Sequence, residues 1–309
     1  MKARGVSLAR MGMEDGTRET LMGRLRAGFL LAGFILSAMI LMPAQALALK
    51  MNWPLAKRLP NFYHRFLCKL VGIRVVTRGE PYKGGACLIA ANHTSWLDIP
   101  IMASLQPSSF VAKSEVAGWP FFGTLARLQQ TVFVERERRT RTAESRNEIH
   151  ARIAGGDRLI LFPEGTSSDG NRVLNFKSAL MSVAQLTIVN GDEDREDDLV
   201  VQPVSVAYVK LHGLPMGRQF RPFFAWYGDM ELFPHLWEAF SLGPIDVMVE
   251  YHKPVTIREI GNRKALAMYC EESCRAGLIR AINGRFDEEP EVTTAAGPVE
   301  MPPRLAAAL

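Results

Sequence analysis

Cysteine is scarce in this sequence, with four in 309 residues. So few thiols exclude a disulfide framework and are typical of a protein kept in a reducing compartment. Cys270 and Cys274 could share one face of a helix, but no histidine stands close to them in the sequence. Core packing is therefore favoured over metal binding, and we expect neither a metal nor an organic cofactor.

Glycine-rich nucleotide-binding motifs are missing as well: the sequence holds no P-loop and no dinucleotide fingerprint. Residues 165–170, GTSSDG, narrowly miss the Gly-x-Ser-x-Gly of a serine nucleophile, because Asp169 stands in place of the second glycine. A hydrophobic content of 48% with 9% aromatic residues excludes a disordered or fibrous chain. The length suits one large α/β domain with appendages, or two small domains.

The formal net charge of +5 divides unevenly along the chain. Residues 1–79 carry 13 Lys and Arg against three acidic residues, giving +10, and the remainder carries 24 against 29, giving −5. The bases flank Ala27–Leu49, 23 residues without a charge, which exceeds the roughly 18 that mark a membrane-spanning candidate. Lys50–Arg78 then combines seven bases with interleaved aromatic residues, a composition that suits the headgroup layer of a membrane.

Three alternatives for the apolar stretch stay open. It could be a buried helix of a soluble protein, although its basic flanks argue against this reading. It could be a cleaved signal peptide, because Ala44–Ala46 resembles a cleavage site, although the preceding region would be long and would contain acids. Pro43 could also turn the segment back as a re-entrant hairpin.

The positions of the bases also bear on location and partners. The stronger positive flank follows the apolar stretch, so a spanning segment would place the main domain on the cytoplasmic side of the inner membrane. We therefore expect membrane lipids as partners. A nucleic-acid partner is not expected, because no groove-reading motif supports it.

From Ile73 onward, short β-branched runs alternate with helical segments. This order predicts an α/β fold, a layered domain with a largely parallel or mixed sheet flanked by helices and preceded by N-terminal membrane helices. The expected strands are Ile73–Thr77, Ala86–Ala91, Ser109–Lys113, Thr131–Glu135, Arg158–Phe162, Leu199–Tyr208 and Ile245–Tyr251. The expected helices are Ser95–Leu105, Trp119–Leu128, Thr142–Ala154, Phe176–Ile188 and Arg263–Ile282.

These patterns divide the chain into four regions. We expect a basic segment over 1–26, membrane-anchoring and interfacial helices over 27–72, a main domain over 73–286 and a loose tail over 287–309. The acidic stretch 191–198, GDEDREDD, is expected to be a solvated loop.

The first chemical motif is NHTSWLD, residues 92–98, which follows an expected strand. Open α/β sheets present catalytic groups at strand ends. His93, with Asp98 five residues later, could act as a general base with an orienting carboxylate. Alternatively, Ser95 and Asp98 resemble a helix capping box, in which Asp98 would only accept bonds from backbone N–H groups. The two roles can coexist.

The second motif is FPEGTSS, residues 162–168, at the end of another expected strand. It places the Glu164 carboxyl at the sheet edge, and Gly165 would let a ligand approach the main chain closely. Taken alone, Pro-Glu-Gly is more typical of a plain turn.

Together the two motifs resemble the glycerolipid acyltransferase family, whose hallmarks are Asn-His-x4-Asp and Phe-Pro-Glu-Gly-Thr-Arg-Ser. The intervening FVAKSE (110–115), WPFFG (119–123) and TVFVER (131–136) resemble the second block of the family, and VQPV (201–204) resembles the fourth. The ordered match runs from about Gly72 to Tyr208 and, with the N-terminus, suits bacterial lysophosphatidate acyltransferases. WYGDM (226–230) and PHLW (234–237) look like the subgroup that acylates lyso-ornithine lipid.

The resemblance implies roles for particular residues. His93 would be the general base and Asp98 its partner. Glu164, Gly165 and Thr166 would line the acceptor site, and Arg136 would contact the anionic head of the acceptor.

One position departs from the family pattern. The family usually has Arg where this sequence has Ser167, and that Arg is associated with binding the acceptor phosphate. A phosphate-bearing acceptor is therefore less well supported, unless Arg172 or Lys177 compensates.

The implied reaction moves a fatty acyl group from acyl carrier protein or coenzyme A to a lysolipid hydroxyl, on a lyso-ornithine-type aminolipid, 1-acyl-glycerol-3-phosphate or both. A thiol of pKa near ~8.5 leaves without a strong acid, so one His–Asp pair can suffice for direct transfer. Two other classes stay open: a non-catalytic, membrane-anchored lipid-binding protein, and a membrane esterase.

Overall fold

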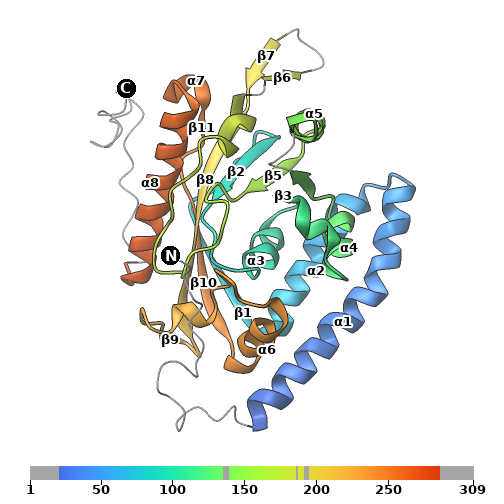
Figure 1. The fold of residues 1–309 in the computed structure, drawn as a ribbon, viewed down its shortest axis with the longest axis vertical. Coiled ribbons are helices and arrows are strands. Elements are labelled where there is room, and N and C mark those ends of the chain that lie inside the picture. The colour runs from blue at the N-terminus through green and yellow to red at the C-terminus, as the bar shows by residue number, and fades with distance from the viewer. Residues whose placement is uncertain (1–20, 135–138, 186, 191–194, 286–309) are drawn as a thin grey trace.

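The computed structural model describes residues 21–134, 139–185, 187–190 and 195–285 (Figure 1). Most of the expected basic N-terminal segment and the expected tail over 287–309 lie outside the described residues, and so does Arg136.

Two helices precede the sheet, α1 (Leu21–Lys50) and α2 (Leu55–Val71). Helix α1 continues through Pro43, so the apolar stretch does not turn back there. Helix α2 is amphipathic, and it ends at Gly72, whose φ of 83° is the left-handed conformation that commonly terminates a helix. The two helices pack against each other, and α1 also contacts α6 (Leu232–Leu242) and α4 (Phe122–Leu128).

The domain is built on a mixed sheet. Its strands lie in the order β1 (Ile73–Arg78), β10 (Ile245–Tyr251), β8 (Val200–Leu211), β2 (Cys87–Ala91), β5 (Arg158–Leu161), β3 (Ser109–Lys113) and β4 (Val132–Val134). Neighbours from β8 to β4 are parallel, whereas β10 runs antiparallel to β8 and parallel to β1. Two short strands, β9 (Leu214–Pro215) and β11 (Val255–Thr256), also pair with β8. The expected fold class is thereby confirmed.

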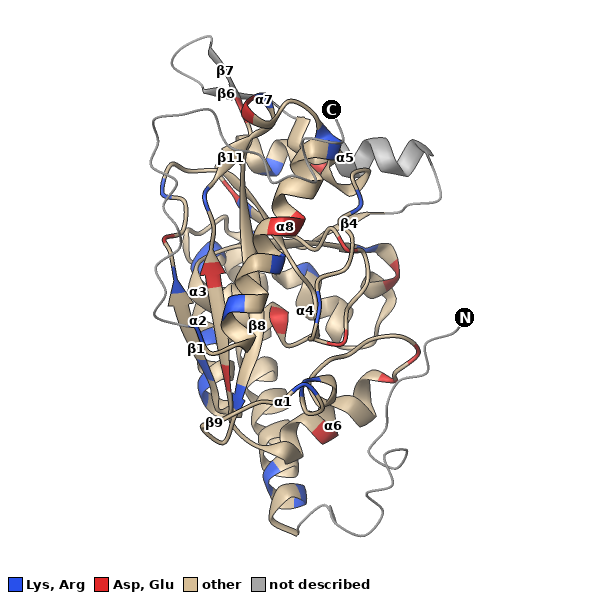
Figure 2. Ribbon diagram, turned by 90° about the vertical axis from the view of Figure 1, so that its left-hand side faces the viewer, with Lys and Arg blue, Asp and Glu red and all other residues tan. Residues whose placement is uncertain are grey.

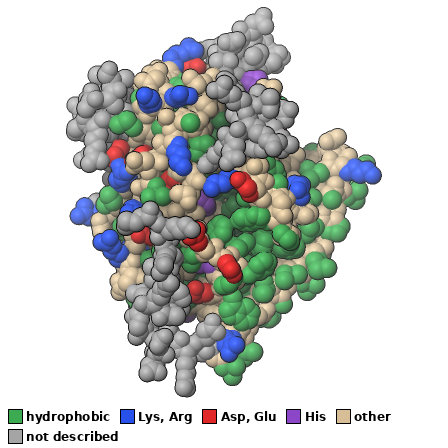
Figure 3. Space-filling model, viewed as in Figure 1, with side chains coloured by type: hydrophobic (Ala, Val, Ile, Leu, Met, Phe, Trp, Pro, Cys, Tyr) green, Lys and Arg blue, Asp and Glu red, His purple; other side chains and the backbone are tan. Residues whose placement is uncertain are grey.

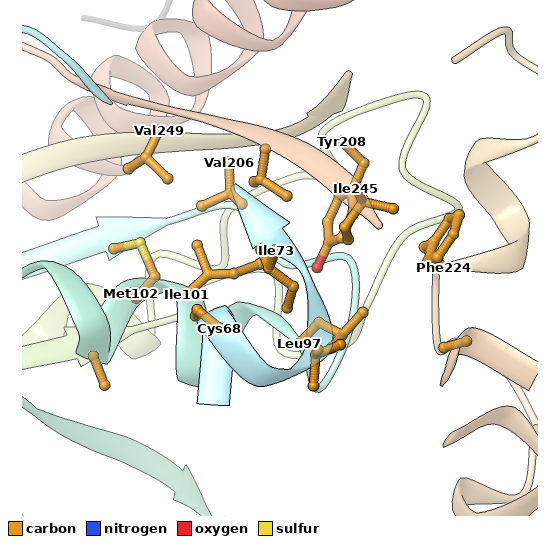
Figure 4. Packing of buried hydrophobic residues seen from close by; sticks show 14 of the residues in the cluster. Cys68, Ile73, Leu97, Ile101, Met102, Val206, Tyr208, Phe224, Ile245 and Val249 are labelled. Carbon is orange, nitrogen blue, oxygen red and sulfur yellow. The ribbon is translucent and has the colours of Figure 1, made fainter. Parts of the chain in front are cut away.

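Helices cover both faces of this sheet (Figure 1). Helix α8 (Arg263–Ile282) packs on one face, near α7 (Ile257–Ile260), and α5 (Arg139–Ala154) contributes to the same core. On the other face lies α3 (Asp98–Leu105), with α2 packed behind it. Side chains of β8 alternate between the two cores, as the two-residue period of a strand requires. Figure 4 shows the second core, in which Val206 and Tyr208 of β8 lie with Leu97 and Ile101.

Each expected strand is present, and the helix Arg263–Ile282 has the predicted ends. The predicted helix over Phe176–Ile188 is wrong: it contains a short 3-10 helix, Leu180–Gln185, and the start of β6 (Thr187–Asn190). The stretch is bonded to other parts of the fold at both ends, by Phe176 N–H to Glu271 and by the pairing of β6 with β7 (Arg195–Asp198). The predicted loop over 191–198 is wrong in its second half, which forms β7, whereas residues 191–194 lie outside the described residues.

Helix α1 presents an apolar surface to the outside. It carries its charged residues near its ends, and no charge falls in the 23 residues from Ala27 to Leu49 (Figure 2). Figure 3 shows hydrophobic side chains gathered over this part of the molecule. The exposed large apolar side chains of the helix are Leu21, Met22, Leu25, Phe29, Ile35, Leu36, Met39, Ile40 and Leu47. By length and composition, α1 could cross a membrane.

Candidate active site

The first motif forms the junction between β2 and α3. His93 follows the end of β2, and Asp98 is the first residue of α3. His93 Nδ1 lies 2.8 Å from Asp98 Oδ2. The Asp98 side chain is fully buried, whereas 18% of the His93 side chain is exposed. Because Nδ1–H donates to the carboxylate, the lone pair of the neutral imidazole is on Nε2, where it can accept a proton.

Three further donors converge on the Asp98 carboxylate. Oδ2 also accepts hydrogen bonds from the backbone N–H groups of Thr94 (2.7 Å) and Ser95 (3.0 Å), and Oδ1 accepts one from the Tyr208 hydroxyl (2.8 Å). Asp98 therefore orients the imidazole and also binds the backbone of its own loop, so the two roles considered for it coexist. The Ser95 hydroxyl does not complete a capping box.

Tyr208 is a site residue that the motif analysis missed. It lies in β8, 110 residues after Asp98 in the chain, and is 1% exposed. Burial, together with the neighbouring Asp98, raises the pKa of Tyr208 well above its ordinary value. The hydroxyl therefore stays protonated and donates its hydrogen bond to Asp98. A hydroxyl within an apolar strand was the only sequence signal that pointed to this role.

Two phenylalanines hold the His93 ring. The imidazole is stacked on Phe162 at 4.1 Å between ring centroids, and Phe162 is stacked in turn on Phe110 at 6.2 Å. Phe162 directly follows β5, and Phe110 lies in β3, the strand paired with β5. The stack restricts rotation of the imidazole and leaves the bond to Asp98 to set its orientation.

The second motif contacts the backbone of the first at His93. Glu164 Oε1 accepts a hydrogen bond from His93 N–H at 3.0 Å, and Ser168 N–H donates to the His93 carbonyl at 2.8 Å. Glu164 is 1% exposed, and this burial raises its pKa to about 8. Gly165, at a φ of 70°, makes the turn that the sequence suggested, with its N–H on the Phe162 carbonyl. The segment is thus both a turn and a partner of the His93 loop.

The remaining predicted acceptor residues lie on the surface beside this turn. Thr166 and Lys177 have exposed side chains, and Lys177 is attached here by its backbone N–H, which donates to the Pro163 carbonyl at 2.9 Å. Arg172 is exposed and lies 3.9 Å from Asp169. The structure therefore brings His93, Asp98, Glu164 and Gly165 together and leaves the two cations at the rim.

A later segment of the chain folds back onto the first motif. Trp226 N–H donates to the Thr94 carbonyl at 2.9 Å, and the Trp96 indole N–H donates to His235 Nδ1 at 3.0 Å. Burial lowers the pKa of His235 to about 4, which keeps its ring neutral and able to accept this bond. The WYGDM and PHLW stretches are therefore parts of the site's wall.

Arg221 ties the loop after the second motif to β8. Its buried guanidinium donates to Asn171 Oδ1 at 3.0 Å, to the Tyr208 carbonyl at 3.2 Å and to the Met216 carbonyl at 2.7 Å. No motif in the sequence marks this residue. Because each of its three guanidinium nitrogens donates a hydrogen bond within the protein, Arg221 supports the site rather than binding a ligand.

An apolar cavity of about 210 Å³ lies between the N-terminal helices and the domain. Trp96 and Leu97 of the first motif line it, as does Phe110, which belongs to the ring stack on His93. Its other walls come from α1, α2, α4 and α6 and include Phe34, Leu41, Leu59, Leu125 and Leu236. The cavity thus extends from the vicinity of the His93 stack toward the membrane-candidate helix. Within the described ranges, no group of three His, Cys, Asp or Glu side chains is placed to hold a metal.

Comparisons with known proteins show the family to which this chain is related. The acyltransferase family model matches residues 72–207. The chain is 45% identical over 265 residues to a lyso-ornithine lipid O-acyltransferase from Brucella abortus, covering 86% of this chain and 98% of that relative. It is 40% identical over 248 residues to a lyso-ornithine lipid O-acyltransferase from Rhizobium meliloti, covering 80% and 84%.

A solved structure has the same fold. The 1-acyl-sn-glycerophosphate (LPA) acyltransferase from Thermotoga maritima superimposes with a TM-score of 0.56 at 22% identity, over 84% of this chain and 97% of that one. The family resemblance carried by the two motifs is therefore confirmed, and the chain belongs to the acyltransferase family.

Proposed function

We propose that this acyltransferase transfers a fatty acyl group from a thioester to the hydroxyl of a lyso-ornithine-type lipid at a membrane, with His93 as the general base. The observation that carries the proposal is the bond between His93 Nδ1 and an Asp98 carboxylate that is itself held by three other donors. This arrangement leaves Nε2 as the base. We further propose 73–286 as the catalytic domain and 27–72 as its anchor.

The reaction needs few protein groups. The lysolipid oxygen attacks the thioester carbonyl while its proton passes to His93 Nε2, and the C–S bond then breaks to release the thiolate. A positioned base contributes roughly 10²- to 10⁴-fold to such a step. The leaving thiol has a pKa near ~8.5, so the imidazolium can return the proton without a second acid. Asp98 stabilises the imidazolium in the meantime.

The acceptor is proposed from two observations. The relatives at 45% and 40% identity are named lyso-ornithine lipid O-acyltransferases. Ser167, in place of the usual arginine of the family motif, leaves the acceptor side without the cation that the family associates with a phosphate. Of the nearby cations, Arg172 faces Asp169 at the surface. A headgroup without a phosphate therefore fits this site better.

The cavity and α1 suggest how the lipid parts are held. A wall of apolar side chains beside the His93 stack suits the acyl chain of the donor. The outward apolar face of α1 suits a bilayer. Gln45 supports retention of α1 rather than its removal as a signal peptide, because its side-chain amide donates to the Ala56 and Leu128 carbonyls and so ties α1 to the domain.

Parallel assays with two acceptors test the proposal. Purified protein in mixed micelles receives lyso-ornithine lipid or lysophosphatidate with labelled palmitoyl thioester, offered on acyl carrier protein or on coenzyme A. We expect transfer to lyso-ornithine lipid to dominate. Transfer to lysophosphatidate alone would contradict the acceptor, and free fatty acid released without any acceptor would indicate an esterase.

The base assignment has its own variant. His93→Ala should lose roughly 10²- to 10⁴-fold in kcat while the protein still accumulates in membranes. His150→Ala, which removes an exposed imidazole of α5, is the matched control and should retain activity. Near-normal turnover by His93→Ala would refute the general base and favour a binding protein or another chemistry.

A further inference from the structure

Three buried polar side chains in the wall of the cavity carry polar atoms without a hydrogen-bond partner among the described residues. They are Gln45 of α1, His64 of α2 and Gln129, which follows α4. Each is more than nine-tenths buried, with exposed fractions of 5%, 8% and 9%. We call these three residues the polar cluster.

Each member of the polar cluster keeps an atom without a partner among the described residues. The Gln45 amide nitrogen donates to the Ala56 and Leu128 carbonyls at 2.9 and 2.8 Å, which fixes its orientation and leaves Oε1 unpaired. His64 Nε2 lies 3.0 Å from Gln129 Oε1, which leaves His64 Nδ1 and Gln129 Nε2 unpaired. Buried polar atoms are rarely left in this state in folded proteins, and each costs roughly 1–3 kcal/mol.

The unpaired atoms form a complementary set. Burial lowers the pKa of His64 to about 4, so its ring is neutral at physiological pH. With Nε2–H donating to Gln129, the pair offers an acceptor at His64 Nδ1 and a donor at Gln129 Nε2. If the amide is reversed, the donor and the acceptor exchange places, and the pair still offers one of each. Gln45 Oε1 adds a second acceptor. A hydroxyl, which donates once and accepts, matches this set.

The polar cluster lies far from the reacting atoms. The Gln129 carbonyl accepts a hydrogen bond from Ser109 Oγ at 3.0 Å. In the sheet, Ser109 is paired with Leu159, and Leu159 is paired with Leu88 of β2, so these residues lie at the same height along the strands. His93 comes five residues after Leu88, beyond the carboxyl end of β2. At about 3.3 Å per residue, the two levels are roughly 16 Å apart. A chain whose thioester sits at His93 would therefore reach the polar cluster with its distal part.

We propose that the polar cluster binds a hydroxyl on the distal part of the donor's acyl chain and makes hydroxylated acyl groups preferred substrates. This inference rests on the proposed function, because it needs an acyl chain in the cavity. An unsubstituted chain would bury the same polar atoms without partners. A ketone could only accept, and so would leave the acceptors of the cluster unpaired.

Donors that differ only in the position of one hydroxyl test the inference. Palmitoyl thioester is compared with derivatives in which the hydroxyl moves stepwise from the β-carbon to the ω-carbon, all with lyso-ornithine lipid as acceptor. We expect kcat/KM to rise roughly threefold to tenfold over palmitoyl for a hydroxyl in the distal half, the gain of one or two net hydrogen bonds. A β-hydroxyl should bring no gain.

A double variant links the preference to the polar cluster. His64→Phe with Gln129→Met replaces both bonded partners by apolar groups of similar shape, a change that proteins tolerate better than loss of one partner. The ratio of hydroxylated to plain substrate should then fall to one or below. Leu125→Met, which alters an apolar part of the same wall, should keep the wild-type ratio.

The outcomes distinguish failure of the proposed function from failure of the hydroxyl preference. Absence of transfer from every one of these donors by the wild type would refute the proposed function. Palmitoyl transfer with no gain at any hydroxyl position would refute the inference alone, and would indicate that water satisfies the polar cluster. A gain that persists in the double variant would also overturn it, because the preference would then arise elsewhere.

Discussion

The Tyr208 hydroxyl donates to Oδ1 of Asp98 at 2.8 Å, while Oδ2 of the same carboxylate holds His93 Nδ1 at 2.8 Å. One strand in the middle of the sheet thus reaches the His93 imidazole through a single carboxylate. In Figure 4 the Tyr208 side chain projects from β8 into the core that Leu97 and Ile101 share, with its oxygen at the tip. The position of the imidazole therefore depends on the packing of β8 against the His93 loop.

Removing this hydroxyl should slow the reaction without unfolding the protein. Tyr208→Phe leaves Oδ1 buried with one donor fewer, a loss of roughly 1–3 kcal/mol shared between stability and orientation of the base. We expect kcat to fall roughly tenfold, with KM for the lysolipid unchanged. Tyr251→Phe, a buried tyrosine in the same core, is the control for the loss of a hydroxyl. Equal kcat in the two variants would mean that Tyr208 only packs.

Asp98→Asn tests whether the carboxylate acts in catalysis or only binds its loop. An amide cannot stabilise an imidazolium, so kcat should fall roughly 10²- to 10⁴-fold. Steady-state kinetics and thermal melting are measured on the same sample. A variant that melts at a lower temperature but turns over normally would leave Asp98 with the loop-binding role alone.

The raised pKa of Glu164 predicts a pH-dependent stability. The unfolded chain loses this proton near pH 4.5, whereas the folded protein keeps it to about pH 8, so the contribution is fully present below pH 4.5 and is lost as pH rises toward 8. Across this window the loss is on the order of 5 kcal/mol. Glu164→Gln, which can still accept from His93 N–H, removes the titration.

Thermal melting of the wild type and Glu164→Gln in detergent checks this sign. The melting temperature of the variant should gain on that of the wild type as pH increases from about 5 to about 8. A difference that stays constant over this range would show that Glu164 is not held protonated by its burial.

Restoring the usual arginine of the family should change the choice of acceptor. Ser167→Arg adds a cation beside the exposed end of the Pro-Glu-Gly turn, where it can pair with a phosphate headgroup. We expect kcat/KM for lysophosphatidate to rise relative to lyso-ornithine lipid by roughly tenfold, the worth of one charge-assisted bond. Ser108→Arg adds the same charge at the opposite end of the sheet and should leave the ratio unchanged. An unchanged ratio in Ser167→Arg would refute the account given for this position.

The outward face of α1 predicts how the protein binds a membrane. Leu36→Lys with Ile40→Lys places two charges in the middle of the exposed apolar surface, at roughly 2.5–3.5 kcal/mol each for a spanning helix. Less protein should then remain in carbonate-washed membranes. Ile279→Lys, an exposed apolar position of α8 on the other side of the sheet, is the control. Full retention of the double variant would argue against α1 as the anchor.

Several parts of the fold could be predicted because their information is local. The buried strands are short runs of β-branched and apolar residues, and α8 has a capping Asn262 at one end and Asn283-Gly284 at the other. The stretch Phe176–Ile188 could not be predicted in this way, because its conformation depends on Glu271 and on β7, which lie elsewhere in the chain.

By itself, the sequence determined the family, the main strands of the sheet and the His93–Asp98 pair, because a spacing of five residues across a strand–helix junction is enough to bring those two side chains together. Only the tertiary structure decided which groups surround the pair. Tyr208 reaches Asp98 across 110 residues, and His64 reaches Gln129 across 65. Such contacts are made by the packing of strands and helices and leave no periodic signal in the sequence. The groups that position His93 and the polar cluster therefore became visible only once the chain was folded.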